Sequence, residues 1–296
     1  MSTHDDLPFN FCGLSAALTG FEEAQVLIWP VPYEKTVSYG RGTKEGPHAI
    51  IDASRYVETY DEELDAEVSN IGIHTLSAID CEKRPEEMMR ALEHDAGQLL
   101  DTGKFLCSLG GEHSISAPLV RAFRARFPDL SVLQIDAHAD LRDTYEGTAY
   151  SHASTMRRIL EVCPAVQVGI RSLSAEEARA IPSLSTNVFY AKDIVGKSEW
   201  IDNAVDLLSE HVYLTIDIDG LDPSLVPATG TPEPGGLTWN DALSLIRTLA
   251  ARRNVVGMDL VELCGDHASN VSSFVAAKLI YKTLGYIFRE RLVSFK

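Results

Sequence analysis

The sequence predicts one α/β domain, built on a mostly parallel sheet of about eight strands with helices covering both faces. Short apolar runs alternate with segments of helical spacing along the 296 residues, which is the pattern of βαβ units. We see no internal repeat, linker or low-complexity tract that interrupts this alternation. Polar residues follow several strands directly, and in open parallel sheets ligands bind beyond the carboxyl ends of the strands.

Before residue 103, proline, glycine and acidic residues separate the elements. Residues 1–24 are expected to form an irregular, loosely packed leader, and residues 25–296 the single domain. In order, we expect a strand at 25–31, a helix from Pro47 to about residue 58, an edge strand at 71–76 and a helix at 86–101. The acidic run 61–67 is interpreted as a solvated loop.

From residue 105 onward, strands and helices alternate regularly. Strands are expected at 105–109, 132–135, 166–170, 188–190, 212–216 and 255–259. Helices are expected at 115–127, 154–162, 175–180, 200–210, 238–251 and 269–289. With the two earlier strands, this gives the eight strands of the predicted sheet.

Composition and charge narrow the classes of protein. A formal net charge of −17 argues against nucleic-acid binding, because phosphate backbones require an excess of Lys and Arg. An acidic mouth could instead attract a cationic small molecule. The N-terminus lacks the pattern of a signal peptide, and no segment reaches the length of a membrane span. Five cysteines without a CxxC pair favour a reducing compartment, so we expect a cytoplasmic protein.

The end of the strand at 132–135 carries a group of residues that suits a cation. Asp136, His138 and Asp140 follow the strand at positions i, i+2 and i+4. In an extended backbone alternate side chains share a face, so all three would point to one spot. Such an arrangement is electrostatically costly unless a cation lies there.

Two further segments place similar residues at strand ends. The strand at 212–216 ends in Asp217 and Asp219, and Gly110 and Gly111 allow a sharp turn that presents His113 after the strand at 105–109. The set of two imidazoles and four carboxylates matches two divalent cations, and its oxygen-rich character suits Mn²⁺. The alternative is a group of exposed loop carboxylates that binds no metal.

These motifs resemble the ureohydrolase family, which includes arginases, agmatinases and formiminoglutamases. The resemblance lies in Gly-Gly-Glu-His-Ser (110–114), Asp-Ala-His-Ala-Asp (136–140), Tyr-Ser-His-Ala-Ser (150–154), Asp-Ile-Asp-Gly-Leu-Asp-Pro (217–223) and Ala-Thr-Gly-Thr-Pro-Glu-Pro-Gly-Gly (228–236). It runs in order from about residue 30 to 290. It implies an arginase-like fold, a three-layer α/β/α sandwich with an eight-stranded, mostly parallel sheet, and a homo-oligomer of three or six chains.

The resemblance also implies the roles of the site residues. Two Mn²⁺ per chain would be held by His113, Asp136, His138, Asp140, Asp217 and Asp219, and a bridging hydroxide would attack the guanidinium carbon. Asp140 would also accept a proton. His152 would bind substrate and shuttle a proton to the departing amine, and Glu262 would pair with the guanidinium. The alternatives are a loop histidine and a solvent-facing glutamate without a role.

Two departures from the family pattern concern neighbours of these residues. Glu112 stands where many relatives have Asp, and Leu263-Cys264-Gly265 follows Glu262 where many relatives read Val-Asn-Pro or similar. The ligand at the first position is the neighbouring histidine, so little loss is expected there. The second departure weakens the assignment of Glu262, and Cys264 is interpreted as a packing residue or a sensitive thiol.

The loop after Asp140 indicates the substrate. Residues 142–151 contain no Asn, and they include Asp143, Glu146 and two tyrosines, which suit a cationic tail better than a carboxylate. We therefore expect agmatine, hydrolysed to putrescine and urea in polyamine biosynthesis, with Glu146 as a candidate partner of the amine. Arg142 could instead hold a carboxylate and support guanidinobutyrate. Arginine and formiminoglutamate are further alternatives, as is a catalytically silent relative that acts as a regulatory subunit.

Overall fold

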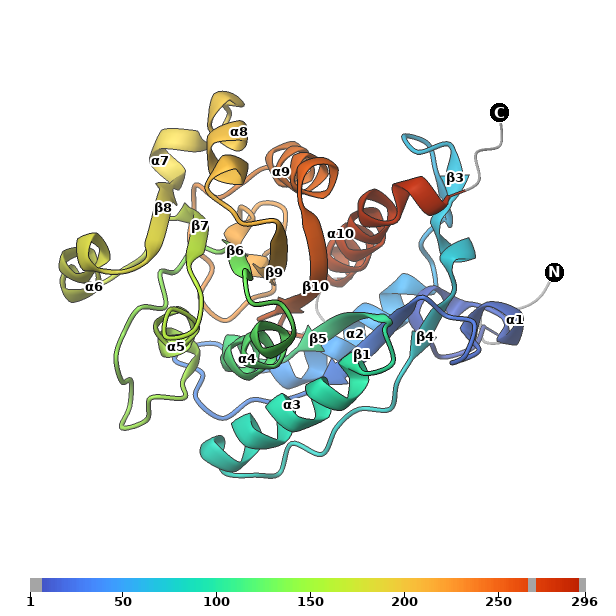
Figure 1. Cartoon of the computed structure of the whole chain (residues 1–296), viewed down its shortest axis with the longest axis horizontal. Coiled ribbons are helices and arrows are strands. Elements are labelled where there is room, and N and C mark those ends of the chain that lie inside the picture. Colours follow the sequence, from blue (N-terminus) through green and yellow to red (C-terminus); the bar gives the residue numbers. More distant parts are fainter. Residues whose placement is uncertain (1–6, 266–269, 293–296) are drawn as a thin grey trace.

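The computed structural model describes residues 7–265 and 270–292 as a sheet between two layers of helices (Figure 1). The eight strands lie in the order β4–β1–β5–β10–β9–β6–β7–β8, and every neighbouring pair is parallel. Along the sheet they are β4 Ile73–Thr75, β1 Val26–Val31, β5 Phe105–Gly110, β10 Asn254–Val261, β9 His211–Asp217, β6 Ser131–Ile135, β7 Ala165–Ile170 and β8 Thr186–Tyr190. The predicted eight-stranded sheet is confirmed, with the short strand β4 at its edge.

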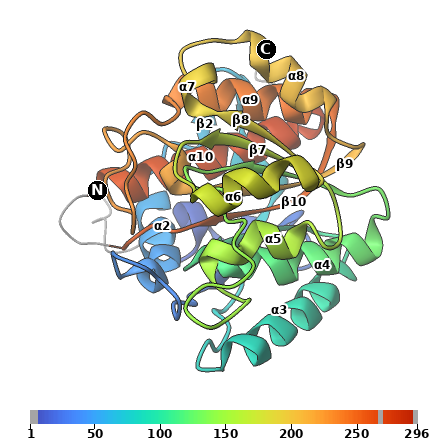
Figure 2. The ribbon, with the colours of Figure 1, turned by 90° about the vertical axis from the view of Figure 1, so that its left-hand side faces the viewer.

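Helices cover both faces of this sheet (Figures 1 and 2). One layer contains α2 Gly46–Ser54, α8 Glu199–Asp206, α9 Trp239–Arg252 and α10 Val271–Ile287. The other contains α3 Pro85–Leu100, α4 Ser116–Arg126 and α5 Thr155–Ile159. The short helices α6 Ala175–Ala180 and α7 Ala191–Ile194 lie beside the β7–β8 edge, and α1 Ala16–Thr19 precedes β1. The three-layer architecture is confirmed.

Alternation within the strands explains the two layers. In β1, Val26 and Ile28 belong to the core under α2 and α10, whereas Leu27 and Trp29 belong to the core under α3 and α4. Both sets are apolar because successive side chains point to opposite faces and helices cover both of them. Among the described residues, none of the helices has the length and apolar character needed to cross a membrane.

The interpretation of residues 61–67 as a solvated loop holds for the exposed Glu62 and Glu63 but is wrong for the two ends of the segment. The segment forms a hairpin of β2 Tyr60–Asp61 and β3 Ala66–Glu67. Asp61 is fully buried, and its Oδ2 lies 2.9 Å from Nζ of the buried Lys282 on α10. The partner is far away in the sequence, so a local reading of an acidic run could not reveal this burial.

Residues near the N-terminus also reach the core. Phe11 and Cys12 are buried in the short helical turn Phe11–Gly13, and the backbone N–H of Cys12 donates to Ser54 Oγ at 2.8 Å. The described part of the leader is therefore not loosely packed at this point. The division of the chain after residue 24 stays a prediction.

The buried pair of Lys282 and Asp61 leads to a prediction about stability. Burial raises the pKa of Asp61, but the bond to Lys282 and the backbone N–H groups of Leu64 and Glu63 outweigh it and lower the pKa. Lys282→Met would leave this carboxylate without its counter-charge, so we expect a loss of about 3–5 kcal/mol in the free energy of unfolding at neutral pH. Denaturant unfolding measures it.

The lowered pKa of Asp61 determines how this loss of stability depends on pH. A carboxyl with a lowered folded pKa stabilises the protein above its unfolded pKa of about 3.9, and that contribution disappears as the pH falls through the folded pKa. The difference in the free energy of unfolding between wild type and Lys282→Met should therefore become smaller at acidic pH. Lys278→Met, on the same helix, is the control. A loss for Lys282→Met no larger than for this control would contradict the assignment.

Candidate active site

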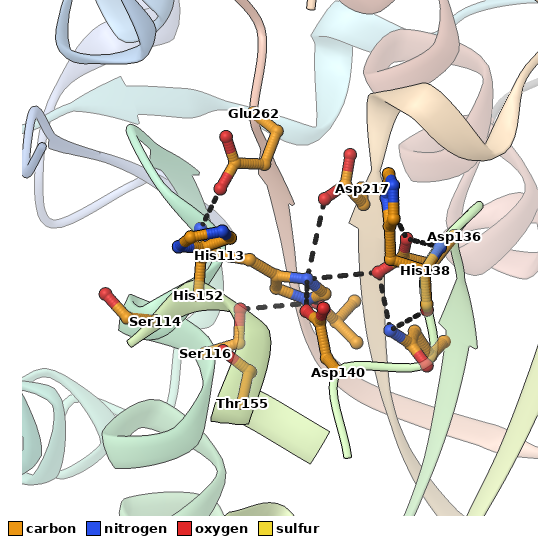
Figure 3. Close-up of polar contacts among 12 residues, drawn as sticks. His113, Ser114, Ser116, Asp136, His138, Asp140, His152, Thr155, Asp217 and Glu262 are labelled. Atoms are coloured by element: carbon orange, nitrogen blue, oxygen red, sulfur yellow. Dashed lines mark hydrogen bonds and ion pairs between the residues drawn. The ribbon is translucent and has the colours of Figure 1, made fainter. Parts of the chain in front are cut away.

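Four neighbouring strands in the middle of the sheet carry the predicted site residues at their carboxyl ends. Because β5, β10, β9 and β6 are parallel neighbours, these ends meet at one edge of the sheet. The residues are His113 after β5, Glu262 after β10, Asp217 and Asp219 at the end of β9, and Asp136, His138 and Asp140 after β6. The structure brings together all six predicted metal ligands, and Figure 3 labels all of them except Asp219.

Two glycines allow the close approach of these strand ends. A Cβ on Gly111 would lie 2.0 Å from the carbonyl oxygen of Tyr33, so any side chain there would displace the turn that presents His113. A Cβ on Gly220 would lie 2.7 Å from the backbone nitrogen of Asp136. The turn after β9 can therefore approach β6, and the N–H of Ala137 donates to Asp219 Oδ1 at 3.0 Å.

The ring of His113 lies among three carboxylates (Figure 3). Its Nδ1 is 3.0 Å from Asp140 Oδ2, 3.1 Å from Asp136 Oδ2 and 3.5 Å from Asp217 Oδ2. Nevertheless, among the described residues this buried nitrogen has no hydrogen-bond partner of suitable geometry. A cation would satisfy this nitrogen and the carboxylate oxygens together, so the donor set fits a metal ion.

The other ring nitrogen of His113 supports this interpretation. Its Nε2 lies 3.0 Å from Thr215 Oγ1, and the Thr215 hydroxyl donates to Asp259 Oδ1 at 2.6 Å. The threonine oxygen is therefore left to accept the Nε2 proton, and the lone pair of Nδ1 then faces the carboxylates. A hydrogen bond that fixes the tautomer of a ligating histidine is common around protein-bound metals.

A second group adjoins the first. His138 Nδ1 is 2.9 Å from Asp219 Oδ2 and 3.7 Å from Asp136 Oδ1. The sets His113–Asp136–Asp140 and Asp136–His138–Asp219 each offer ligand atoms that lie within 4.8 Å of one another. Asp136 is common to both, so the geometry provides for two neighbouring cations.

Electrostatics favour positive charge at this point. Burial, together with repulsion from Asp219 and Asp140, raises the pKa of Asp136 to about 7. Burial and the charges of Asp219 and Asp136 raise the pKa of Asp217 well above its usual range. Burial lowers the pKa of His138, but the pair with Asp219 outweighs it and raises the pKa to about 10. The buried carboxylates thus stabilise protons that a cation would replace, and the residues fit a divalent metal with oxygen and imidazole ligands.

Glu262 and His152 lie on the wall of the same cavity, which has a volume of about 260 Å³. Glu262 Oε1 accepts the backbone N–H of His113 at 2.6 Å. The ring of His152 lies between two hydroxyls, with Nδ1 3.2 Å from Thr36 Oγ1 and Nε2 2.9 Å from Ser38 Oγ. Both side chains therefore border the space above the acidic cluster.

Comparison with known proteins agrees with this geometry. The sequence model that describes the Arginase family matches residues 24–285. The chain belongs to the arginase family. The N(1)-aminopropylagmatine ureohydrolase of Synechocystis sp. is 40% identical over 281 residues, 92% of each chain. The agmatinase of Bacillus anthracis is 35% identical over 271 residues, 89% of this chain and 92% of the relative.

Solved structures show the same relationship. The agmatine ureohydrolase of Thermoplasma volcanium is 31% identical with a TM-score of 0.86 over 96% of each chain. The arginase of Medicago truncatula is 27% identical with a TM-score of 0.75, over 90% of this chain and 88% of the other. The arginase-like sandwich is confirmed. Because the relatives are ureohydrolases, the predicted enzyme class, a hydrolase of linear amidines, is also confirmed.

Two residues of this arginase-family site have unusual backbone conformations. Asp140 and Glu262 have φ values of 52° and 62°, in the left-handed region that residues other than glycine seldom adopt. Strain of this kind gathers at functional sites, where the surrounding structure holds a side chain in place. No pattern in the sequence indicates it.

Glu146 does not reach the cavity of the arginase-family site. It is exposed within the turn that Tyr145 and Thr148 close by mutual backbone hydrogen bonds, and it is not among the residues that line the cavity. Its position therefore gives no support to a role as partner of the substrate amine.

The sequence reasoning missed several residues around the cavity. Glu177 is buried and accepts the N–H groups of Leu141 at 3.0 Å and Ser174 at 2.7 Å, which ties the loop after β6 to α6. The spacing Ser-x-x-Glu before an apolar stretch is a capping box, so this signal was present. Thr36 and Ser38 were missed because nothing local connects them to His152.

Proposed function

We propose that this chain hydrolyses the guanidino group of a cationic alkylamine, agmatine or its N(1)-aminopropyl derivative, to urea and a free amine. The observation that carries the proposal is the convergence of six candidate metal ligands, from the carboxyl ends of β5, β9 and β6, beneath a cavity bordered by Glu262 and His152. The proposed cofactor is a pair of Mn²⁺ ions, held by His113, Asp136, His138, Asp140, Asp217 and Asp219. When bound, such ions activate water near neutral pH and polarise the substrate.

The other side chains suit the remaining tasks. Glu262 borders the cavity above the cluster, where a carboxylate can pair with the planar guanidinium and orient it. Asp140 is the proposed proton acceptor when water adds to the guanidinium carbon. His152 delivers a proton to the amine nitrogen as the carbon–nitrogen bond breaks, because imidazole side chains can both donate and accept protons in general acid–base catalysis.

The charge around the cavity favours a cationic tail. Among the described residues that line it, there are five carboxylates and one guanidinium, that of Arg142. Three of the carboxylates are proposed metal ligands and Glu262 is the proposed partner of the guanidinium, so Glu177 is the carboxylate that remains for a tail. Arg142 Nε lies 3.9 Å from Glu177 Oε2, and its guanidinium lies over the ring of Tyr145, 5.4 Å from the centroid. Its charge is thus already engaged by these neighbours, which argues against its use as a carboxylate receptor.

The longer substrate is the second candidate, because relatives named N(1)-aminopropylagmatine ureohydrolase are 39–40% identical to this chain, against 35% for the Bacillus anthracis agmatinase. Hydrolysis with release of urea would give putrescine from agmatine. From N(1)-aminopropylagmatine it would give N-aminopropylputrescine. We also propose that the enzyme acts in the cytoplasm, as its cysteine usage suggests, and as a homo-oligomer, as the family resemblance implies.

A substrate panel tests the proposal. With Mn²⁺ present, we expect urea from agmatine or N(1)-aminopropylagmatine, with kcat/KM at least about 100-fold above that for guanidinobutyrate or arginine, because a negative tail beside the carboxylate of Glu177 costs several kcal/mol. The ratio between the two cationic compounds decides which is the substrate. Preference for guanidinobutyrate would contradict the preference for a cationic tail. Release of formamide from formiminoglutamate, included in the same panel, would indicate a formimino substrate, and no turnover of any compound would favour a silent relative.

A further inference from the structure

We propose that Glu112 is a positioning residue that acts through Thr36 to keep the proton of neutral His152 on Nδ1, so that Nε2 is the nitrogen that exchanges protons with the substrate. The inference deepens the proposed function, because it concerns the proton carrier of the same site. Glu112 and Thr36 are buried and do not line the cavity, whereas His152 does. The three residues therefore run from the interior to the cavity wall.

Glu112 accepts four hydrogen bonds and is fully buried. Its Oε2 accepts the backbone N–H groups of Lys35 at 2.6 Å and Thr36 at 2.7 Å, and these groups can only donate. Its Oε1 accepts the hydroxyls of Thr36 at 2.8 Å and Ser114 at 2.6 Å. The carboxylate is thus held by two backbone and two side-chain donors.

The direction of these bonds fixes the direction of the next one. A threonine hydroxyl has a single hydrogen, and Thr36 donates it to Glu112. Its oxygen can then only accept from His152, whose Nδ1 lies 3.2 Å away and whose backbone N–H lies 3.1 Å away. Neutral imidazole carries one ring proton, so that proton is on Nδ1 and the lone pair is on Nε2.

The free nitrogen faces the cavity side of the ring. His152 Nε2 lies 2.9 Å from Ser38 Oγ, whose hydroxyl donates to Tyr145 Oη at 3.0 Å, and both of these residues line the cavity. The Ser38 hydrogen is bonded to a neutral phenol on the exposed side, whereas the Thr36 hydrogen is bonded to a buried carboxylate, and hydrogen bonds to charged acceptors are roughly twice as strong. Ser38 therefore turns its hydrogen to Nε2 more readily than Thr36 turns its own to Nδ1. Nε2 can therefore take up a proton and release it to a departing amine, while Nδ1 stays bonded to Thr36. With the opposite tautomer, the nitrogen that accepts protons would face the buried side.

The experiment reads the tautomer directly. The protein, labelled with ¹⁵N-histidine and without added metal, is examined by NMR about two pH units above the ordinary imidazole pKa of about 6.5, and His152→Asn assigns the signal. In wild type, Nε2 should resonate as an unprotonated nitrogen. In Glu112→Gln, the amide oxygen replaces Oε2 and the NH₂ group donates to Thr36, so the threonine hydrogen turns to Nδ1 and the ring proton moves to Nε2. A wild-type proton on Nε2, or an unchanged tautomer in Glu112→Gln, would overturn the proposal.

Two further comparisons separate this effect from general disturbance. Ser114→Ala removes another bond to Glu112 but leaves the path to His152 intact, so the tautomer should stay on Nδ1. Thr36→Val breaks the path and should abolish the preference, and Thr36→Ser should restore it, which keeps the test available if Glu112→Gln does not fold. Loss of the preference in Ser114→Ala, or its retention in Thr36→Val, would count against the proposal.

Activity provides the second measurement. With metal restored, Glu112→Gln should lower kcat about 10–100-fold, the usual effect of losing a partner that orients a functional group, with little change in KM. The NMR result does not depend on turnover. Failure of every guanidino compound as a substrate would therefore refute the proposed function without deciding the tautomer, and the wrong tautomer in an active enzyme would refute only the role of Glu112.

Discussion

Asp136→Asn is expected to abolish urea release and to lower the bound Mn²⁺ below one ion per chain. Asp136 is the residue common to both ligand sets, and it is fully buried between His113 and His138. The amide keeps the shape of the side chain but loses its negative charge. In the wild type, the N–H of His138 and the side-chain amide of Gln134 both donate to Asp136. The NH₂ group of the asparagine would therefore face one of these two donors, with which it cannot form a hydrogen bond. We expect kcat to fall more than about 100-fold, beyond the usual effect of losing an outer partner of a ligand.

Metal analysis after gel filtration and a urea assay together check this result. Asp202→Asn makes the same chemical change on α8, where Asp202 is exposed and pairs with Arg252, and it should leave both measurements unchanged. An Asp136→Asn protein that keeps two ions and its activity would show that the buried carboxylates do not form the metal centre.

His152→Asn is expected to lower kcat by about 10²–10⁴, the range that a positioned proton donor contributes, while metal content stays as in wild type. His152 lies on the cavity wall but belongs to neither ligand set, so loss of its ring should affect proton transfer rather than metal binding. Steady-state kinetics with the preferred substrate, combined with metal analysis, would separate the two effects.

The matched control for this variant is His94→Asn, since His94 is exposed on α3 and far along the chain from the site residues after β6. This substitution should not change kcat. If His152→Asn kept the wild-type kcat, another group would have to deliver the proton. If it lost its metal instead, His152 would belong to the metal site.

The sheet and the ligand set could be predicted from the sequence because both depend on local patterns. Apolar runs bounded by turn residues mark the strands, and the alternate spacing of Asp136, His138 and Asp140 at a strand end places them on one face. Since parallel strands present their carboxyl ends at one edge, His113 and Asp217 could be expected to join them, although only the structure shows that β5, β10, β9 and β6 are neighbours.

Features that depend on distant partners could not be predicted in this way. Asp61 looks like part of a solvated run, but its partner Lys282 comes from the last helix. In the sequence, Glu112 is a conservative replacement of Asp beside the ligand His113. In the structure, Thr36 connects Glu112 to His152, and these three residues are far apart in the sequence. The composition of its loop predicts Glu146 as a partner of the substrate amine, but its side chain is exposed in the turn between Tyr145 and Thr148.

The metal centre is tested most directly by a titration of metal-stripped protein with Mn²⁺. Calorimetry measures the binding of the ions, and urea release from the two cationic guanidino compounds measures the activity at each step. We expect two ions to bind per chain, and activity to be absent in the stripped protein and to return as the sites fill. Binding of no more than one ion, or full activity of the stripped protein, would contradict a two-metal hydrolase.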